Sequence, residues 1–140
     1  MKRSVFTLEE LRNSAAGQRA DNAHLFQPVK KVKRAKYGNS KIEFEGLFFD
    51  SKAELRRYRE LLLLMKEGLI GQLRTQVKYL LIEASETERE CCYVADFDYY
   101  TTAGEHVIED TKSEPTRKLP AYVMKRKLMA SVHGLTIKEV

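Results

Sequence analysis

Residues 94–113, VADFDYYTTAGEHVIEDTKS, carry the strongest signal in the sequence for the predicted fold. The two halves of this stretch are rich in β-branched and aromatic residues, and Ala103-Gly104-Glu105 between them is typical of a tight turn, so a β-hairpin is expected. Each predicted strand carries an acid, Asp96 on the first and Asp110 on the second. Lys112 lies two residues after Asp110, so the two side chains share one face of the strand. Two acids on neighbouring strands with a lysine beside them form a minimal site for divalent-metal phosphodiester chemistry.

Each of these residues also has a simpler explanation. Asp96 can face water on an edge strand, but a mid-chain hairpin among apolar residues is expected to be central, where a charge is costly unless it is paired or metal-bound. Asp98 shares the face of Asp96 by the two-residue period and is expected to be a solvated or supporting acid. Asp110 and Lys112 can equally form a surface ion pair that contributes ~0–1 kcal/mol. Glu109 points to the opposite face and becomes the alternative ligand if the strand contains a bulge.

Bulk composition excludes several classes of protein. The 140 residues are 43% hydrophobic and 32% charged, which is typical of a globular protein. No apolar run reaches the ~20 residues that cross a bilayer, and the N-terminus lacks a signal-peptide core, so we expect a cytoplasmic protein without a membrane partner. Cys91 and Cys92 are neighbours in a predicted strand and should stay reduced. The sequence has no Gly-rich phosphate loop, and no organic cofactor is expected.

The net charge of +5 is distributed unevenly along the chain. Residues 1–41 carry ten Lys/Arg against three Asp/Glu, whereas residues 42–140 carry fifteen against seventeen. A basic arm on a mildly acidic body favours a polyanion partner such as DNA, with the arm contacting phosphates, although a tail that only improves solubility has the same composition. The predicted DNA-contacting residues of the arm are Lys30, Lys31, Lys33, Arg34 and Lys36.

Periodicity and turn signals predict an α/β order of elements. A short helix is expected within residues 4–16, capped by Thr7, followed by an irregular, extended or mobile linker from Gly17 to Lys41. The later elements are a hairpin at 41–50, a helix at 51–68, a connection at 69–75, a strand at 76–83, the central hairpin, an irregular loop at 113–120, a helix at 121–133 and a last strand. The buried face predicted for the 51–68 helix consists of Leu55, Tyr58, Leu61, Leu62 and Met65.

Glu54 has two possible roles. It follows Ser51 by three residues at a predicted helix start, which is the spacing of a capping box. The other role is a carboxylate at the helix N-terminus that points to a metal. The spacing alone favours the cap, because capping boxes are common at helix starts.

The order and spacing of these motifs resemble the PD-(D/E)xK nuclease superfamily. Glu54 on a helix, Asp96 on a strand and Asp110-Thr111-Lys112 fourteen residues later carry the resemblance. Between Lys36 and Val140, the blocks GLFFDSKAELRRYRELLLL, GLIGQLRTQVKYLL, ADFDYY, IEDTKS, KRKL and IKEV are similar to a family of small phage- and prophage-encoded endonucleases. Members of this family are grouped with Holliday-junction resolvase-like enzymes.

The resemblance implies a restriction-endonuclease-like core, in which helices flank a central mixed β-sheet. This nuclease domain would occupy residues 37–140, after a partly flexible basic N-terminal arm at residues 1–36. It also implies that Glu54, Asp96 and Asp110 ligate Mg²⁺ or Mn²⁺. Lys112 would orient the attacking water and stabilise charge on the phosphate.

The resemblance further implies that Gln76 supports the site and that Lys125 and Lys127 hold DNA phosphates. The expected activity is hydrolysis of branched or structured DNA in phage recombination or replication, in the host-cell cytoplasm. Paired nicks on a junction need two active sites, which favours a homodimer. The alternatives are a non-catalytic DNA-binding module on the same fold, a restriction-like enzyme and a transposon-end-cleaving nuclease.

Overall fold

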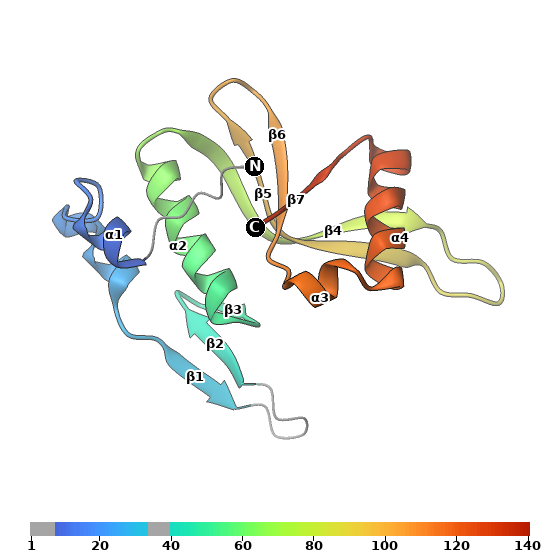
Figure 1. Cartoon of the computed structure of the whole chain (residues 1–140), viewed down its shortest axis with the longest axis horizontal. Helices are drawn as coiled ribbons and strands as arrows, with labels where there is room; N and C mark the ends of the chain where they lie inside the picture. The colour runs from blue at the N-terminus through green and yellow to red at the C-terminus, as the bar shows by residue number, and fades with distance from the viewer. Residues whose placement is uncertain (1–7, 34–39) are drawn as a thin grey trace. The chain divides into compact units, whose positions relative to one another are not determined.

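The computed structural model describes residues 8–33 and 40–140, and the chain divides into two compact units, residues 1–69 and 70–140 (Figure 1). The domain boundary predicted at residues 36/37 falls in the segment 34–39, outside the described residues. No helix in the described part of the chain has the length and apolarity that a membrane crossing requires.

Unit 1 contains a three-stranded antiparallel sheet in the order β1-β2-β3. Its elements are α1 (Leu8–Asn13), the 3₁₀ helix η1 (Ala20–Phe26), β1 (Lys30–Lys33), β2 (Ser40–Phe44), β3 (Leu47–Phe49) and α2 (Lys52–Lys66). The hairpin predicted at 41–50 is confirmed as β2 and β3. Its two-residue turn, Glu45-Gly46, has positive φ at both positions, as the twist of a tight hairpin requires.

The predicted helix at 51–68 is confirmed as α2, which begins after its N-cap Ser51. Leu55, Tyr58, Leu61 and Leu62 are buried, and Tyr58 contacts the rings of two phenylalanines in the β2–β3 hairpin. Met65 was predicted in the same buried face but is 37% exposed, because it lies in the last turn of the helix.

The irregular linker predicted from Gly17 to Lys41 is wrong for residues 20–26 and 30–33. These residues form η1 and β1, and β1 pairs with β2. Long-range contacts order this polar segment: Leu25 is fully buried, and Arg59 of α2 donates a hydrogen bond to the carbonyl of Gln27 at 2.7 Å. A local pattern contains no signal of these contacts. The predicted cap Thr7 lies outside the described residues.

Unit 2 is built on a mixed four-stranded sheet in the order β4-β5-β6-β7. The first three strands are antiparallel, and β7 is parallel to β6. The elements are β4 (Ile70–Ile82), β5 (Cys91–Thr101), β6 (His106–Asp110), α3 (Glu114–Arg117), α4 (Pro120–Leu128), the π-helix η2 (Met129–His133) and β7 (Ile137–Glu139). The central hairpin is confirmed as β5 and β6, which are both interior strands, and Gly104 in its turn has φ 81°.

The core of unit 2 lies between its sheet and the helices α4 and η2 (Figure 1). Its buried side chains come from all four strands and from both helices, so one face of the sheet is covered. They are Leu81, Tyr93, Ala95, Ile108, Tyr122, Met129 and Ile137. The chain is therefore α/β, with a mixed four-stranded sheet flanked by helices.

Two details of unit 2 differ from the sequence prediction. β4 begins at Ile70 rather than at Gln76, because pairing with β5 extends through residues 70–75. The predicted irregular loop at 113–120 contains the helical turn α3, with Pro115 near its start, where a proline removes no helical hydrogen bond.

Candidate metal centre

The hairpin register brings Asp96 and Asp110 to one place on the sheet. Phe97 and Glu109 pair at the end of the β5–β6 ladder, and the next residues, Asp96 and Asp110, lie close together there, because Thr111 after Asp110 donates its backbone N–H to Asp96. Asp110 is fully buried, whereas Asp96 is half-buried.

Asp110 is held by two donors. The Lys112 ammonium lies 2.6 Å from one carboxylate oxygen, and the Tyr93 hydroxyl donates to the other at 2.5 Å. The two-residue period predicted that Lys112 and Asp110 share a face, and the contact agrees with it. Lys112 Nζ also lies 5.9 Å from the centre of the Tyr122 ring, over its face. This ammonium is therefore anchored between a carboxylate and an aromatic ring.

Asp96 accepts the backbone N–H of Thr111 at 2.7 Å. The Asp96 carboxylate also lies near the Tyr93 hydroxyl that donates to Asp110. Burial is the main cause that raises the pKa of Tyr93, and the negative charges of Asp110 and Asp96 raise this pKa further. Both aspartates therefore lie close enough to Tyr93 to act on one hydroxyl. The hydroxyl of Thr111, the residue after Asp110, is buried and has no hydrogen-bond partner within the described residues.

Glu109, the alternative ligand, has different partners. It is fully buried, accepts the Tyr99 hydroxyl at 2.6 Å and lies 3.2 Å from the Lys138 ammonium. Its register partner is Phe97, on the other face from Asp110. Asp110, rather than Glu109, is the carboxylate beside Lys112.

Asp98 is not the solvated acid that was one expectation, because it is fully buried. Its carboxylate accepts the Tyr79 hydroxyl, Arg74 Nη2 at 2.9 Å and His106 Nε2 at 2.9 Å. Burial pushes the pKa of Asp98 upward, but the three hydrogen bonds outweigh this effect and the pKa is lowered. Neither the partners nor the burial of Asp98 can be inferred from residue spacing.

Glu54 belongs to unit 1, at the first turn of α2. Its backbone N–H donates to Ser51 Oγ at 3.1 Å, and its carboxylate accepts the backbone N–H of Asp50 at 2.9 Å. The expected capping role is confirmed, although the reciprocal bond reaches the amide of Asp50 instead of that of Ser51. Glu54 is 4% exposed. Its role as a ligand stays a prediction.

The remaining predicted residues are distributed over both units. Gln76 lies inside β4, across from Asp96 between the pairs Thr75–Phe97 and Val77–Ala95, and has φ 52°. Lys125 and Lys127 lie on α4. In the basic arm, the backbones of Lys30, Lys31 and Lys33 belong to β1, and Arg34 and Lys36 lie outside the described residues.

The site formed by Asp96, Asp110 and Lys112, here called the Asp96–Asp110 corner, has oxygen ligands that suit a hard cation. Asp96 and Asp110 supply carboxylate oxygens, which are the ligand type that Mg²⁺ prefers. Within residues 8–33 and 40–140, no group of three or more His, Cys, Asp or Glu side chains is arranged to hold a metal. Unit 2 therefore supplies two of the three predicted carboxylates.

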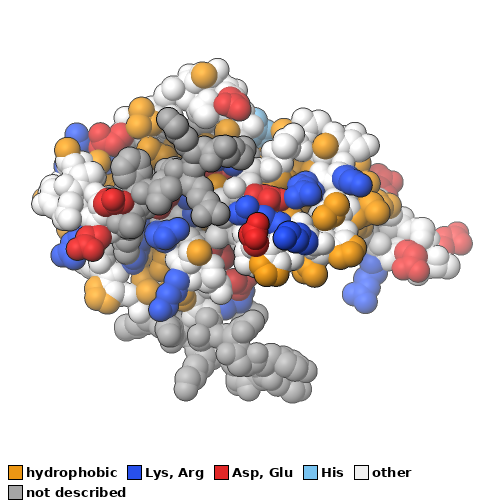
Figure 2. Space-filling model, in the orientation of Figure 1, with side chains coloured by type: hydrophobic (Ala, Val, Ile, Leu, Met, Phe, Trp, Pro, Cys, Tyr) orange, Lys and Arg blue, Asp and Glu red, His pale blue; other side chains and the backbone are white. Residues whose placement is uncertain are grey.

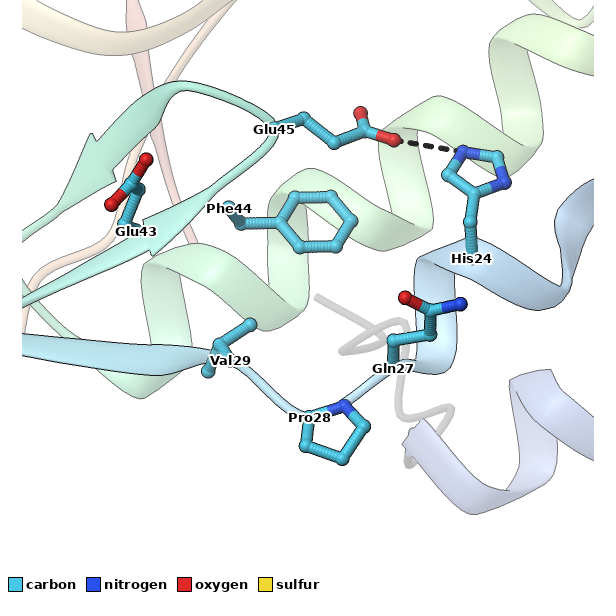
Figure 3. A pocket seen from close by; sticks show the side chains of 7 residues that line it. All are labelled: His24, Gln27, Pro28, Val29, Glu43, Phe44 and Glu45. Carbon is cyan, nitrogen blue, oxygen red and sulfur yellow. Dashed lines mark ion pairs between the residues drawn. The ribbon is translucent and has the colours of Figure 1, made fainter.

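A cavity of about 320 Å³ in unit 1 lies between η1 and the β2–β3 hairpin (Figure 3). His24 and Glu45 form an ion pair across it at 2.9 Å, and the Phe44 ring forms part of its wall. Its lining residues include none of the predicted site residues. The candidate centre in unit 2 is thus a buried polar corner and does not coincide with this cavity.

Charged side chains on the face drawn in Figure 2 are interspersed, with Lys and Arg beside Asp and Glu. The described part of this face has no extended block of one sign.

Residues 34–136 match the family described as "Protein of unknown function (DUF1064)". The chain belongs to this family. The DUF1064 match includes every predicted site residue except Lys30, Lys31 and Lys33. Comparison with curated proteins and with solved structures finds no match.

Proposed function

We propose that the protein is a metal-dependent DNA endonuclease of the PD-(D/E)xK superfamily that hydrolyses phosphodiester bonds in branched or structured DNA. One observation carries the proposal. Asp96 and Asp110 lie close together at the end of the β5–β6 ladder, both act on Tyr93, and the Lys112 ammonium lies 2.6 Å from Asp110. The mixed sheet flanked by helices is compatible with the restriction-endonuclease-like core that belongs to this proposal.

Asp96 and Asp110 would hold Mg²⁺ or Mn²⁺, and the resemblance adds Glu54 as the third carboxylate. When bound, the cation supplies charge neutralisation among the carboxylates and a water of lowered pKa. The chain's own donors orient the ligands: the N–H of Thr111 fixes Asp96, and the Tyr93 hydroxyl fixes Asp110. Partners of this kind, behind the ligands, are a regular part of metal sites.

Lys112 supplies a fixed positive charge beside the carboxylates. Its contacts with Asp110 and the Tyr122 ring restrict the ammonium to one position. Negative charge grows on the phosphoryl oxygens during hydrolysis, and a cation that is already in place stabilises it without reorganising. Lys125, Lys127 and the basic residues of the arm would bind flanking phosphates and supply salt-dependent affinity.

The proposal is tested by incubating the full chain with Mg²⁺ and a panel of DNAs: a four-way junction, a flap, a linear duplex and single strands. We expect cleavage of branched DNA, and a loss of about 100-fold or more in Asp96→Asn and in Lys112→Ala. Glu105→Gln, in the exposed turn of the same hairpin, and Lys118→Ala, an exposed lysine of unit 2, are matched controls that should cleave like the wild type.

Unchanged cleavage in Asp96→Asn or Lys112→Ala would overturn the assignment. DNA binding without cleavage in Mg²⁺ or Mn²⁺ would instead identify a non-catalytic DNA-binding module. Cleavage of linear duplex at a fixed sequence, with the junction uncut, would indicate a restriction-like or transposon-end-cleaving enzyme.

A further inference from the structure

A second polar cluster in unit 2 is organised around the buried carboxylate of Asp98. One of its oxygens accepts His106 Nε2 at 2.9 Å, and the other accepts Arg74 Nη2 at 2.9 Å together with the Tyr79 hydroxyl. The ring of Tyr100 stacks on His106, with centroids 4.6 Å apart and planes at 11°. Asp98 is saturated with donors and fully buried, so its effect is to fix the orientation of its three partners.

Two of those partners reach the surface. The side chain of Arg74 is 56% exposed and that of His106 is 23% exposed, whereas the carboxylate that holds them is inaccessible. A guanidinium has five N–H donors, and only one of those of Arg74 is needed for the 2.9 Å bond to Asp98. The cluster therefore presents to solvent the guanidinium of Arg74 and the imidazole of His106, both oriented by a buried carboxylate.

The backbone of β4 is distorted on both sides of Arg74. An extra residue enters the β4 register between Gly71 and Arg74, and Gln72 there has φ 55°. Gln76, two residues after Arg74, has φ 52°. A residue other than glycine at such φ costs ~1–3 kcal/mol, and strain of this kind gathers at functional sites.

The second distortion also explains how two β4 residues reach one carboxylate. Arg74 and Tyr79 are five residues apart, an odd spacing that in a regular strand would place them on opposite faces. The left-handed φ of Gln76 interrupts the regular alternation of β4 between them, and Arg74 and Tyr79 both donate to Asp98. The strained backbone thus serves the assembly of this cluster.

The cluster lies on the same face of the sheet as the Asp96–Asp110 corner. Asp98 pairs with Ile108, and His106, Ile108 and Asp110 alternate along β6 on one face. Four residues at ~3.4 Å per residue separate His106 from Asp110 by about 14 Å along the strand. Ile108 between them is buried under α4 and η2, so a nucleic acid that bound at both places would have to pass around this covered part of the face.

We propose that Arg74 and His106, held by Asp98, form a binding site for a phosphate of the nucleic-acid backbone that flanks the phosphodiester at the Asp96–Asp110 corner. The inference rests on the proposed function, because it assigns a second contact to the same substrate. Arg suits this role since its planar fork matches phosphate oxygens, and the neighbouring carboxylates make oriented positive groups necessary for an anionic ligand.

The test measures binding of the full chain to a fluorescein-labelled four-way junction by anisotropy, in EDTA and at several salt concentrations. We expect Arg74→Gln, which keeps an N–H for Asp98 but removes the charge, to weaken binding about tenfold. We also expect it to reduce the slope of log K against log salt by about 0.9, the value for one phosphate contact. His106→Gln should weaken binding in the same way in a buffer acidic enough to protonate imidazole, because only the imidazolium has a second N–H for a phosphate while Nε2 binds Asp98.

Lys78→Gln is the matched control. Lys78 also lies in β4 and is also more than half exposed, but it is adjacent to Tyr79, so it points to the other face, where it pairs with Glu90 at 2.5 Å. It should leave affinity and salt slope unchanged. If Arg74→Gln is unstable by urea unfolding, His106→Gln alone decides. Salt slopes in Arg74→Gln and His106→Gln equal to that of Lys78→Gln would overturn the inference.

The outcomes separate the two proposals. If the wild type cleaves in Mg²⁺ and Asp96→Asn does not, while Arg74→Gln and His106→Gln bind like the wild type, the phosphate site is wrong and the nuclease stands. If Arg74→Gln reduces the slope of log K against log salt but the wild type never cleaves DNA, the phosphate site is supported and the proposed nuclease activity is wrong. A wild type that does not bind DNA in EDTA would overturn the phosphate site, and cleavage in Mg²⁺ would still decide the nuclease.

Discussion

Single aspartates along β5 and β6 differ in function because their partners differ. Asp110 and Asp96 are held at one corner by a phenol, an ammonium and a backbone amide. Asp98, only two residues from Asp96, is surrounded by three other donors that neutralise it. The same side chain is thus a candidate metal ligand at one position and an anchor for cationic groups at another.

The tyrosines of the protein predict a loss of stability at high pH. Burial is the main cause that raises the pKa of Tyr58, Tyr79 and Tyr122 above the ordinary value near 10. As the pH rises past about 10, the unfolded chain releases these protons before the folded chain does, so stability present below pH 10 is lost above it. Urea unfolding from pH 8 to 11 should show a falling free energy of unfolding above pH 10.

Tyrosinate absorbance checks the cause of that loss. With seven tyrosines in the chain, the folded protein should ionise at least three of them only at a pH above that of the denatured protein. Superimposable titrations of the folded and denatured protein would contradict the prediction.

For single residues, the sequence pattern predicted which side chains share a face of a strand, but it did not predict their hydrogen-bond partners. The two-residue period placed Lys112 beside Asp110, and the hairpin register brought Asp96 close to it. Tyr93 and Thr111 were not predicted as supports, because the contact that each makes depends on a neighbouring strand. Arg74 and His106 were missed for the same reason, since three strands contribute to the cluster around Asp98.

Secondary-structure elements with strong local signals were predicted well. The β5–β6 hairpin, the β2–β3 hairpin and α2 all combine periodicity with a turn or a cap, and all three are present. Elements that depend on distant partners were missed: η1 and β1 are ordered by packing, and the first half of β4 is extended by pairing with β5. The ends of such elements are determined more by tertiary contacts than by the local sequence.

The start of α2 allows the cap and the ligand roles of Glu54 to be separated. Ser51→Ala removes the oxygen that accepts the Glu54 N–H and should lower the free energy of unfolding by ~1 kcal/mol, with cleavage retained. Glu54→Gln keeps an oxygen for the Asp50 N–H but removes the charge, so it should cost little stability and abolish Mg²⁺-dependent cleavage. Urea unfolding and the junction assay measure the two effects. Full activity in Glu54→Gln would leave Glu54 as a cap alone.

The whole molecule combines two compact units with an uneven charge distribution. Paired cuts in a junction need two active sites related by symmetry, so we expect a homodimer. Light scattering on the eluting protein should give twice the chain mass of 16.2 kDa. A monomer at all concentrations that still makes paired cuts in the junction would contradict this expectation.

The central claim is that Asp96 and Asp110 together bind a divalent cation. Mn²⁺ binding to the full chain, followed by the electron paramagnetic resonance signal of the free ion, tests it most directly. We expect the wild type and Glu105→Gln to take up Mn²⁺, and we expect Asp96→Asn and Asp110→Asn, both folded by circular dichroism, to lose this uptake. Equal Mn²⁺ uptake by all four proteins would contradict this claim.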